Sequence, residues 1–121
     1  MALGKIKADT LEHSTAGSVD TQFVVTGSAK AWVFFDGSGT VAINDSLNTA
    51  SLTDQGTGDY QVNFTNSMDN ANYANTSNSN TFHAVNGNAN SVNNLRVGTY
   101  NSTHSIVDTS RVYTVAHGDL T

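Results

Sequence analysis

The sequence predicts an all-β fold, a small antiparallel β-sandwich of jelly-roll or Ig-like type with an extended N-terminal arm. Glu, Lys, Arg and Gln, which favour helices, are scarce, whereas Val, Thr, Phe and Tyr, which favour strands, are frequent. Short apolar segments alternate with turns rich in Gly, Asn and Asp at intervals of about 8–12 residues, a spacing typical of sandwiches and barrels. A chain of 121 residues, 37% of them hydrophobic, suffices for one modest core.

Residues 1–21 predict an arm that attaches the protein or lets it oligomerise, and residues 22–121 predict the sandwich. Much of the charge lies in the first segment, and its sparse apolar residues lose helical spacing at Lys7. Such a segment can become ordered against a partner chain, and the alternative is a frayed terminus. The residues predicted to make the contacts of the arm are Ile6, Leu11, His13 and Val19.

The strands are predicted from apolar runs and from alternation between apolar and polar residues. Residues 31–35 form a continuous apolar run, long enough for a strand that is buried on both faces. The clearest alternation places Tyr60, Val62 and Phe64 toward the core. The pattern requires no helix. The predicted strands are residues 23–25, 30–35, 40–44, 60–65, 82–85, 94–100 and 111–117, with a short stretch around Leu47 and Leu52.

Turns that contain glycine separate these strands. Residues 36–39 and 54–59 carry glycines that can adopt positive φ, and Asn86-Gly87 is the dipeptide preferred in a type I′ hairpin turn. The chain has no proline, which is the commonest residue that blocks an edge strand. We therefore expect the sheet edges to be protected by twist, by Asn-rich loops or by pairing with other copies.

Charge and composition exclude several classes of partner. The net charge of −5 opposes binding to nucleic acid or to an anionic membrane, because both are recognised through Lys and Arg. No apolar run has the length of a signal-peptide core or a membrane span, so we expect a protein made in the cytoplasm without membrane insertion. The absence of cysteine excludes disulfides and thiolate metal sites.

No residue pattern predicts catalysis, a metal or a cofactor, and we expect the protein not to be an enzyme. The four histidines lack the spacing of a local metal clip, although a symmetric oligomer could gather His13 about its axis. Turn aspartates such as Asp54 and Asp59 are too few for a calcium loop and suit turn capping. No Gly-x-Ser-x-Gly motif occurs, and the single glutamate, Glu12, lies in the arm, which argues against glycoside hydrolysis.

Residues 70–94 are dominated by asparagine and carry isolated aromatic residues. Amide and hydroxyl groups beside an aromatic ring suit hydrogen bonding and stacking on sugars. The alternative is that short polar residues keep long loops soluble. The residues predicted to contact a receptor are Tyr73, Asn75, Asn78, Asn80 and Phe82.

Several stretches of the sequence also carry a resemblance to a known family. They are residues 29–43 (AKAWVFFDGSGTVAI), 54–64 (DQGTGDYQVNF) and 72–74 (NYA), together with 5–11 (KIKADTL) and 116–120 (AHGDL), which look like the usual ends of that family's domain. Together they resemble a domain common in tail-fibre and related virion proteins of marine and other aquatic tailed bacteriophages. The similarity covers nearly the whole chain, and it is strong in the first two-thirds and weak from Ser77 to Ser110.

The resemblance implies a virion component without catalytic residues, a homotrimer assembled about a three-fold axis. We expect a tail fibre or fibre-tip protein whose arm binds other virion proteins of the tail or capsid. The loops from Asn66 to Asn94 would lie at the exposed tip and contact a host surface glycan. One alternative is a capsid decoration or cement protein on the phage head. The others are a free carbohydrate-binding module, which predicts a monomer, and a phage depolymerase.

Overall fold

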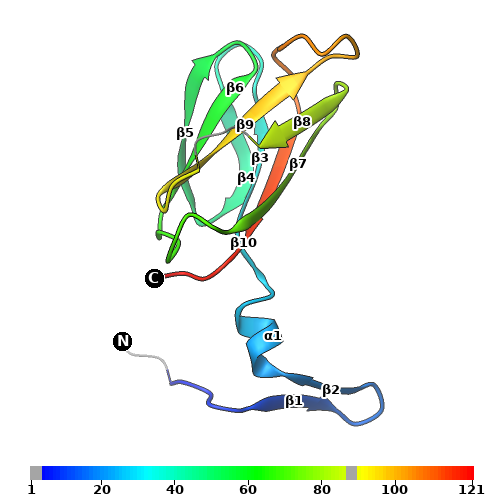
Figure 1. Ribbon diagram of the computed structural model, residues 1–121, viewed down its shortest axis with the longest axis vertical. Helices are drawn as coiled ribbons and strands as arrows, with labels where there is room; N and C mark the ends of the chain where they lie inside the picture. The colour runs from blue at the N-terminus through cyan, green and yellow to red at the C-terminus, as the bar shows by residue number, and fades with distance from the viewer. Residues whose placement is uncertain (1–3, 87–89) are drawn as a thin grey trace.

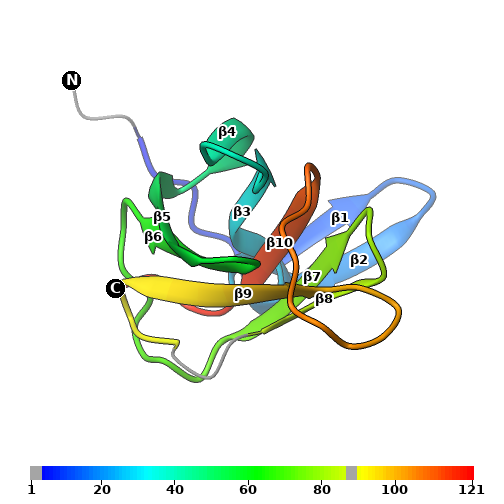
Figure 2. The same ribbon diagram turned by 90° about the horizontal axis from the view of Figure 1, so that it is seen from above.

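Two four-stranded antiparallel sheets pack face to face in the computed structural model, which describes residues 4–86 and 90–121 (Figure 1). The first sheet has the order β4-β3-β10-β7 and the second the order β5-β6-β9-β8, and the two form separate layers when viewed from above (Figure 2). The predicted small antiparallel β-sandwich is therefore confirmed. The strands are β3 (Ala29–Asp36), β4 (Ala42–Leu47), β5 (Thr49–Gly56), β6 (Asp59–Phe64), β7 (Ala74–Ser79), β8 (His83–Asn86), β9 (Asn94–Tyr100) and β10 (Val112–His117).

The core lies between the two sheets and is built by residues at every second position of the central strands. Along β6, Tyr60, Val62 and Phe64 are buried, as their alternation with polar residues predicts. Met68 and Tyr73, from the segment between β6 and β7, close one end of the core. The other buried apolar residues are Ala31, Val33, Phe35, Leu95, Val97, Val112 and Ala116.

Strand β3 differs from the strand buried on both faces that its apolar run predicts. Ala31, Val33 and Phe35 point into the core, whereas Trp32 and Phe34 alternate with them and are only half-buried. The physical reason is that, within residues 4–86 and 90–121, no helix or further sheet covers the outer face of this sheet, unlike the parallel sheets in which such runs are usual. Two large aromatic side chains are therefore left partly in solvent.

The chain crosses from the first sheet to the second at Asn48, between β4 and β5. Asn48 has a φ of 54°, a left-handed conformation that asparagine tolerates better than most residues. Its side-chain oxygen accepts a hydrogen bond from the Asn66 N–H at 2.7 Å, and its amide donates to the Asn66 carbonyl at 3.0 Å. The chain itself joins the two sheets along this side of the sandwich, and these hydrogen bonds fix the conformation of the corner.

The N-terminal segment projects away from the sandwich and carries its own local structure (Figure 1). Strands β1 (Thr10–His13) and β2 (Gly17–Asp20) form a hairpin, and a single helical turn, α1 (Thr21–Val25), follows. The prediction of a strand at residues 23–25 is wrong. The helical turn is closed by backbone bonds from Thr26 N–H to the Gln22 carbonyl and from Gly27 N–H to the Phe23 carbonyl.

The sandwich consequently begins at Ala29 rather than at Gln22. Glycine is required at position 27, just after the helical turn, because a Cβ there would lie 2.2 Å from the Phe23 carbonyl oxygen. Among the described residues, no hydrogen bond joins residues 4–27 to the sandwich. We call residues 4–28 the arm from here on.

The two ends of the sandwich are different in character. The arm and the C-terminal segment leave from one end, whereas the loops at 37–41, 57–58, 80–82 and 101–111 lie at the opposite end, which we call the tip (Figure 1). The prediction that the loops from Asn66 to Asn94 share the tip is wrong for residues 66–73. Asp69 N–H donates to the Asp119 carbonyl and Thr121 N–H to the Ser67 carbonyl, which hold this loop at the arm end. The prediction is also wrong for residues 91–93, which bond to Phe64, Met68 and Tyr73. The turn predicted at Asn86-Gly87 includes residue 87, which lies outside the described residues.

Candidate functional site

Tyr73, predicted to stack on a receptor, lies inside the protein. Its side chain is only 8% exposed, and its ring packs edge-on against Phe64 with the ring centroids 5.8 Å apart. Its hydroxyl donates to the carbonyl oxygens of Asn94 at 2.7 Å and Ser91 at 3.1 Å. A buried ring with a bonded hydroxyl offers no face to a sugar, so the receptor-contact prediction for Tyr73 is wrong.

The burial of Tyr73 predicts a loss of stability in alkali. Burial raises the pKa of this phenol from the ordinary value of 10.0 to about 12. The stabilisation that the folded chain gains by keeping Tyr73 protonated is complete below pH 10. It is lost between pH 10 and 12, because over this interval Tyr73 ionises only in the unfolded chain. We expect the free energy of unfolding to fall by about 2–3 kcal/mol over this interval. Urea unfolding of the wild type and of Tyr73→Phe measures it.

The Tyr73→Phe variant should show a shallower decline over the same interval. A residual slope is expected from Tyr60, whose pKa is also raised by burial. Equal slopes for the two proteins would contradict the assignment to Tyr73.

The three predicted asparagines do not form one surface. Asn75 and Asn78 lie on opposite faces of β7, with Asn75 half-buried toward the core and Asn78 exposed. Asn80 is part of the framework of the tip. Its side-chain oxygen accepts bonds from the Thr109 hydroxyl and, at 3.2 Å, from the Arg111 N–H. Of the five predicted receptor residues, the structure places Asn80 and Phe82 in the turn at the tip.

Phe82 belongs to a group of four rings, two of them exposed and two half-buried, that the sequence did not reveal. The Phe82 side chain is 59% exposed. Its ring centroid lies 5.2 Å from that of His83 and 6.4 Å from that of His104. The His83 ring stacks on Tyr100 at 5.3 Å and lies 5.2 Å from His104. We call Phe82, His83, Tyr100 and His104 the tip cluster.

Strand pairing builds the tip cluster from distant parts of the sequence. His83, at the start of β8, is the direct partner of Tyr100, at the end of β9. Phe82 N–H donates to the Tyr100 carbonyl at 3.2 Å, which holds the turn against β9. No local motif links these residues, so only the β8–β9 register could have revealed the cluster from sequence.

The loop after β9 holds His104 in place through one side chain. The side-chain oxygen of Asn101 accepts from Thr103 N–H at 3.0 Å, from the Thr103 hydroxyl at 2.8 Å and from Ser105 N–H at 3.0 Å. His104 has a φ of 62° and donates its N–H to the Asn101 carbonyl at 3.0 Å. The imidazole is therefore presented by a loop that is already ordered, which lowers the entropic cost of binding.

The predicted arm residues are exposed, and two of them, Ile6 and Leu11, line a groove together with the helical turn. Ile6 is 93% exposed, and Leu11 and Val19 are direct cross-strand partners in the β1–β2 hairpin. A groove of about 520 Å³ runs between the hairpin and α1. Its lining includes Ile6, Lys7, Leu11, Thr21, Val24 and Val25. An apolar groove without a partner in its own chain suits contact with another protein.

His13 has a local role in the same hairpin. Its Nδ1 accepts hydrogen bonds from the N–H groups of Ala16 at 3.1 Å and Thr15 at 3.3 Å, which stabilise the β1–β2 turn. Its meeting with copies of itself at an oligomer axis stays a prediction.

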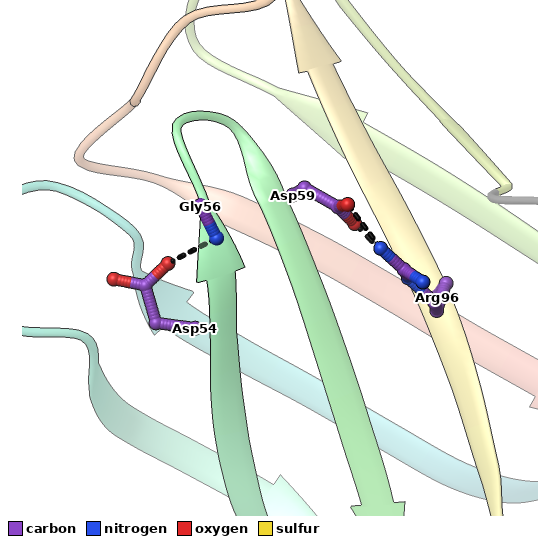
Figure 3. A network of polar contacts seen from close by, with 4 residues as sticks. All are labelled: Asp54, Gly56, Asp59 and Arg96. Atoms are coloured by element: carbon purple, nitrogen blue, oxygen red, sulfur yellow. Dashed lines mark hydrogen bonds and ion pairs between the residues drawn. The ribbon is translucent and has the colours of Figure 1, made fainter.

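The outer face of the second sheet is polar and its side chains bond to one another. Arg96 on β9 donates two hydrogen bonds to the carboxylate of Asp59 on β6, one of them 3.1 Å long (Figure 3). Asp54 accepts from the Gly56 N–H at 2.9 Å and so caps the β5–β6 turn, as predicted for turn aspartates (Figure 3). Asn63 donates to Ser51 and Thr53, both at 3.0 Å. This face has the character of a solvated surface.

Residues 4–86 and 90–121 contain no group of three or more His, Asp or Glu side chains placed to hold a metal ion. Within the same ranges, no helix has the length and apolar character that a membrane crossing requires. Comparisons with protein-family models, with curated proteins and with solved structures find no match to this chain.

Proposed function

We propose that the chain is a non-catalytic structural protein of a tailed-bacteriophage virion, a tail-fibre or fibre-tip component that contacts the host receptor. The observation that carries the proposal is the difference between the two ends of the molecule. The arm leaves one end of the sandwich (Figure 1) and carries exposed apolar side chains, and the tip cluster, with Phe82 and His104 exposed, lies at the other end. The resemblance of residues 29–43 and 54–64 to virion domains supports the same conclusion.

In this proposal the arm anchors the protein to other virion proteins. Leu11, Val19 and Val25 are exposed in the isolated chain, and burying them against a neighbour would supply the hydrophobic free energy of attachment. The protein is made in the host cytoplasm and becomes part of the virion as a homotrimer. If the three arms of the trimer point toward the particle, the three tips point away from it.

The tip cluster would recognise a host surface glycan. The exposed ring of Phe82 offers a flat apolar surface against which one face of a sugar can pack. His83 and His104 add ring nitrogens that donate or accept hydrogen bonds, as hydroxyl-rich ligands require. The ordered loop at residues 101–105 keeps these groups in position before the ligand arrives.

Phage carrying the double substitution Phe82→Ala and His104→Ala are expected to adsorb to host cells about tenfold more slowly or worse. Removal of two exposed rings takes away stacking worth about 0.5–1.5 kcal/mol each. The substitutions touch no core residue, so the thermal unfolding midpoint should hardly change. Adsorption rate constants and melting curves of the purified protein give the two readouts.

Phe82→Tyr is the matched control, because it keeps the ring at the same place. Its adsorption should stay near the wild-type rate. Wild-type adsorption by the double variant, with the protein present on the particle, would overturn the role of the tip cluster.

A capsid decoration protein is the second candidate, because an arm with exposed apolar residues at one end suits attachment to a capsid surface equally well. Copy number separates the two candidates. Quantitative mass spectrometry of purified virions should find a few tens of copies or fewer for a tail component, and hundreds for decoration. A protein that is absent from virions, is monomeric and binds sugars would instead be a free carbohydrate-binding module.

A further inference from the structure

The outer face of the first sheet carries a continuous apolar surface across three strands. Trp32 on β3 is the direct partner of Leu47 on β4 and of Val115 on β10. Phe34 pairs with Tyr113, and their rings stack at 4.7 Å with an interplanar angle of 9°. Paired residues share a face of the sheet, so these five side chains adjoin one another. We call Trp32, Phe34, Leu47, Tyr113 and Val115 the aromatic face.

This surface contrasts with the polar outer face of the second sheet. Leu47 is 48% exposed and Tyr113 is 41% exposed, whereas the equivalent positions of β6 and β9 carry Gln61, Asn63 and Arg96. An antiparallel sheet that faces water normally alternates apolar residues inward with polar residues outward. The second sheet follows this rule and the first does not. Contiguous apolar surface of this kind marks an interaction site.

We propose that the aromatic face packs against a second copy of this chain and forms the interface of the trimer. The inference rests on the homotrimer of the proposed function and identifies the surface that would hold it together. Charge toward the two sides of the face supports a neighbour of the same sequence. Asp45 lies beside Phe34 on the edge strand β4. Arg111 lies just before β10, one strand in from the opposite edge strand, β7.

A ring of copies brings these opposite charges together. Asp45 pairs with Phe34 and Val112 with Phe35, so Asp45 and Arg111 stand within about two residues of the same height, about 7 Å along the strands. A rotation axis parallel to the strands preserves height. It turns the β4 edge of one copy toward the β7 edge of the next, behind which the long Arg111 side chain lies at the start of β10. Asp45 would therefore meet Arg111 of the neighbouring copy.

The same symmetry keeps like ends of the three copies together. Rotation about an axis along the strands places all arms at one end of the assembly and all tip clusters at the other. A two-fold axis perpendicular to the strands would point the arms in opposite directions, which attachment to a particle excludes. The polar outer face of β5, β6 and β9 is left facing solvent, as its hydrogen-bonded side chains require.

The test measures the oligomeric state of the full chain by light scattering and sedimentation. We expect the wild type near three times 12.7 kDa. Leu47→Lys and Tyr113→Lys should each raise the concentration for half-dissociation of the trimer about a hundredfold, because each places a charge inside the interface. Neither side chain belongs to the buried core, and they are 48% and 41% exposed in the monomer, so its fold should persist. Thr53→Lys, an exposed position on the outer face of β5, adds the same charge and should leave the trimer intact.

Trp32 supplies an internal probe, because it is the single tryptophan and it lies in the proposed interface. Its fluorescence should shift to the red, and quenching by acrylamide should increase, on dilution or in the lysine variants. A charge exchange tests the register. Asp45→Arg and Arg111→Asp should each weaken the trimer, and the two together should restore it.

The outcomes separate the interface from the trimer itself. A stable wild-type trimer that survives Leu47→Lys and Tyr113→Lys, and in which acrylamide reaches Trp32, would overturn the aromatic face as the interface. The trimer itself would remain supported. A wild type that stays monomeric up to millimolar concentration, with exposed Trp32, would overturn both the interface and the trimer of the proposed function. Failure of the charge exchange to restore assembly would overturn the proposed pairing of Asp45 with Arg111.

Discussion

A chain that lacks residues 1–27 is expected to fold normally and to be lost from assembled virions. The arm contributes no residue to the core, and no described hydrogen bond joins residues 4–27 to the sandwich. Its removal should change the free energy of unfolding by no more than about 0.5 kcal/mol. The exposed Leu11, Val19 and Val25, which the proposal assigns to attachment, would be gone. Urea unfolding of the purified fragment and mass spectrometry of virions measure the two effects.

Point substitutions in the arm provide the matched controls. Phe23→Ser and Val25→Ser remove exposed apolar side chains and should reduce incorporation, while Ser14→Ala, in the β1–β2 turn, should not. Wild-type levels of the truncated chain on virions would show that attachment does not need the arm. Unfolding of the truncated chain would show that the arm stabilises the sandwich through contacts other than hydrogen bonds.

Tyr60→Ala is expected to destabilise the sandwich by about 3–5 kcal/mol, a large part of the stability of a domain of this size. The Tyr60 side chain is fully buried, and its ring meets Phe35 edge-on with the centroids 5.2 Å apart. Its hydroxyl donates to the Gly37 carbonyl at 2.8 Å, which ties the core to the tip. Chemical unfolding followed through Trp32 measures the change.

Tyr60→Phe separates the hydroxyl from the ring. It keeps the packing and leaves the Gly37 carbonyl without this donor, so we expect a smaller cost of about 1–3 kcal/mol. Gly37→Ala should resemble the larger substitution, because a Cβ there would lie 2.5 Å from the Tyr60 hydroxyl oxygen. A cost for Tyr60→Ala below that for Tyr60→Phe would contradict the packing role of the ring.

The elements with strong alternation could be predicted from sequence. Tyr60, Val62 and Phe64 are buried as expected, because a half-buried strand has a repeat of two residues that the sequence displays directly. Strand β7 was missed, since its six residues, ANTSNS, contain no large apolar side chain. It forms a strand because β10 supplies its hydrogen-bond partners along its full length. That pairing is a property of the whole fold.

The candidate site depended still more on distant contacts. Tyr73 and Phe82 looked alike in sequence as isolated aromatic residues among asparagines, yet one is buried beside Phe64 and the other is exposed beside two histidines. Tyr73 comes just before β7, at the arm end of the sandwich, whereas Phe82 follows β7 at the tip. Phe23 to Val25 formed a helical turn although their side chains favour strands, because no neighbouring strand is present to pair with them.

The pairing of β3 with β10 has a consequence for the order in which the protein matures. These strands are the first and last of the sandwich, and they are hydrogen-bonded neighbours at its centre. The first sheet cannot close on a growing chain until residues 112–117 have left the ribosome, so folding of the sandwich is dominated by contacts distant in sequence. The arm emerges well before that moment. Its local hairpin can form early, and it must then wait with its apolar residues uncovered until a folded sandwich is attached behind it.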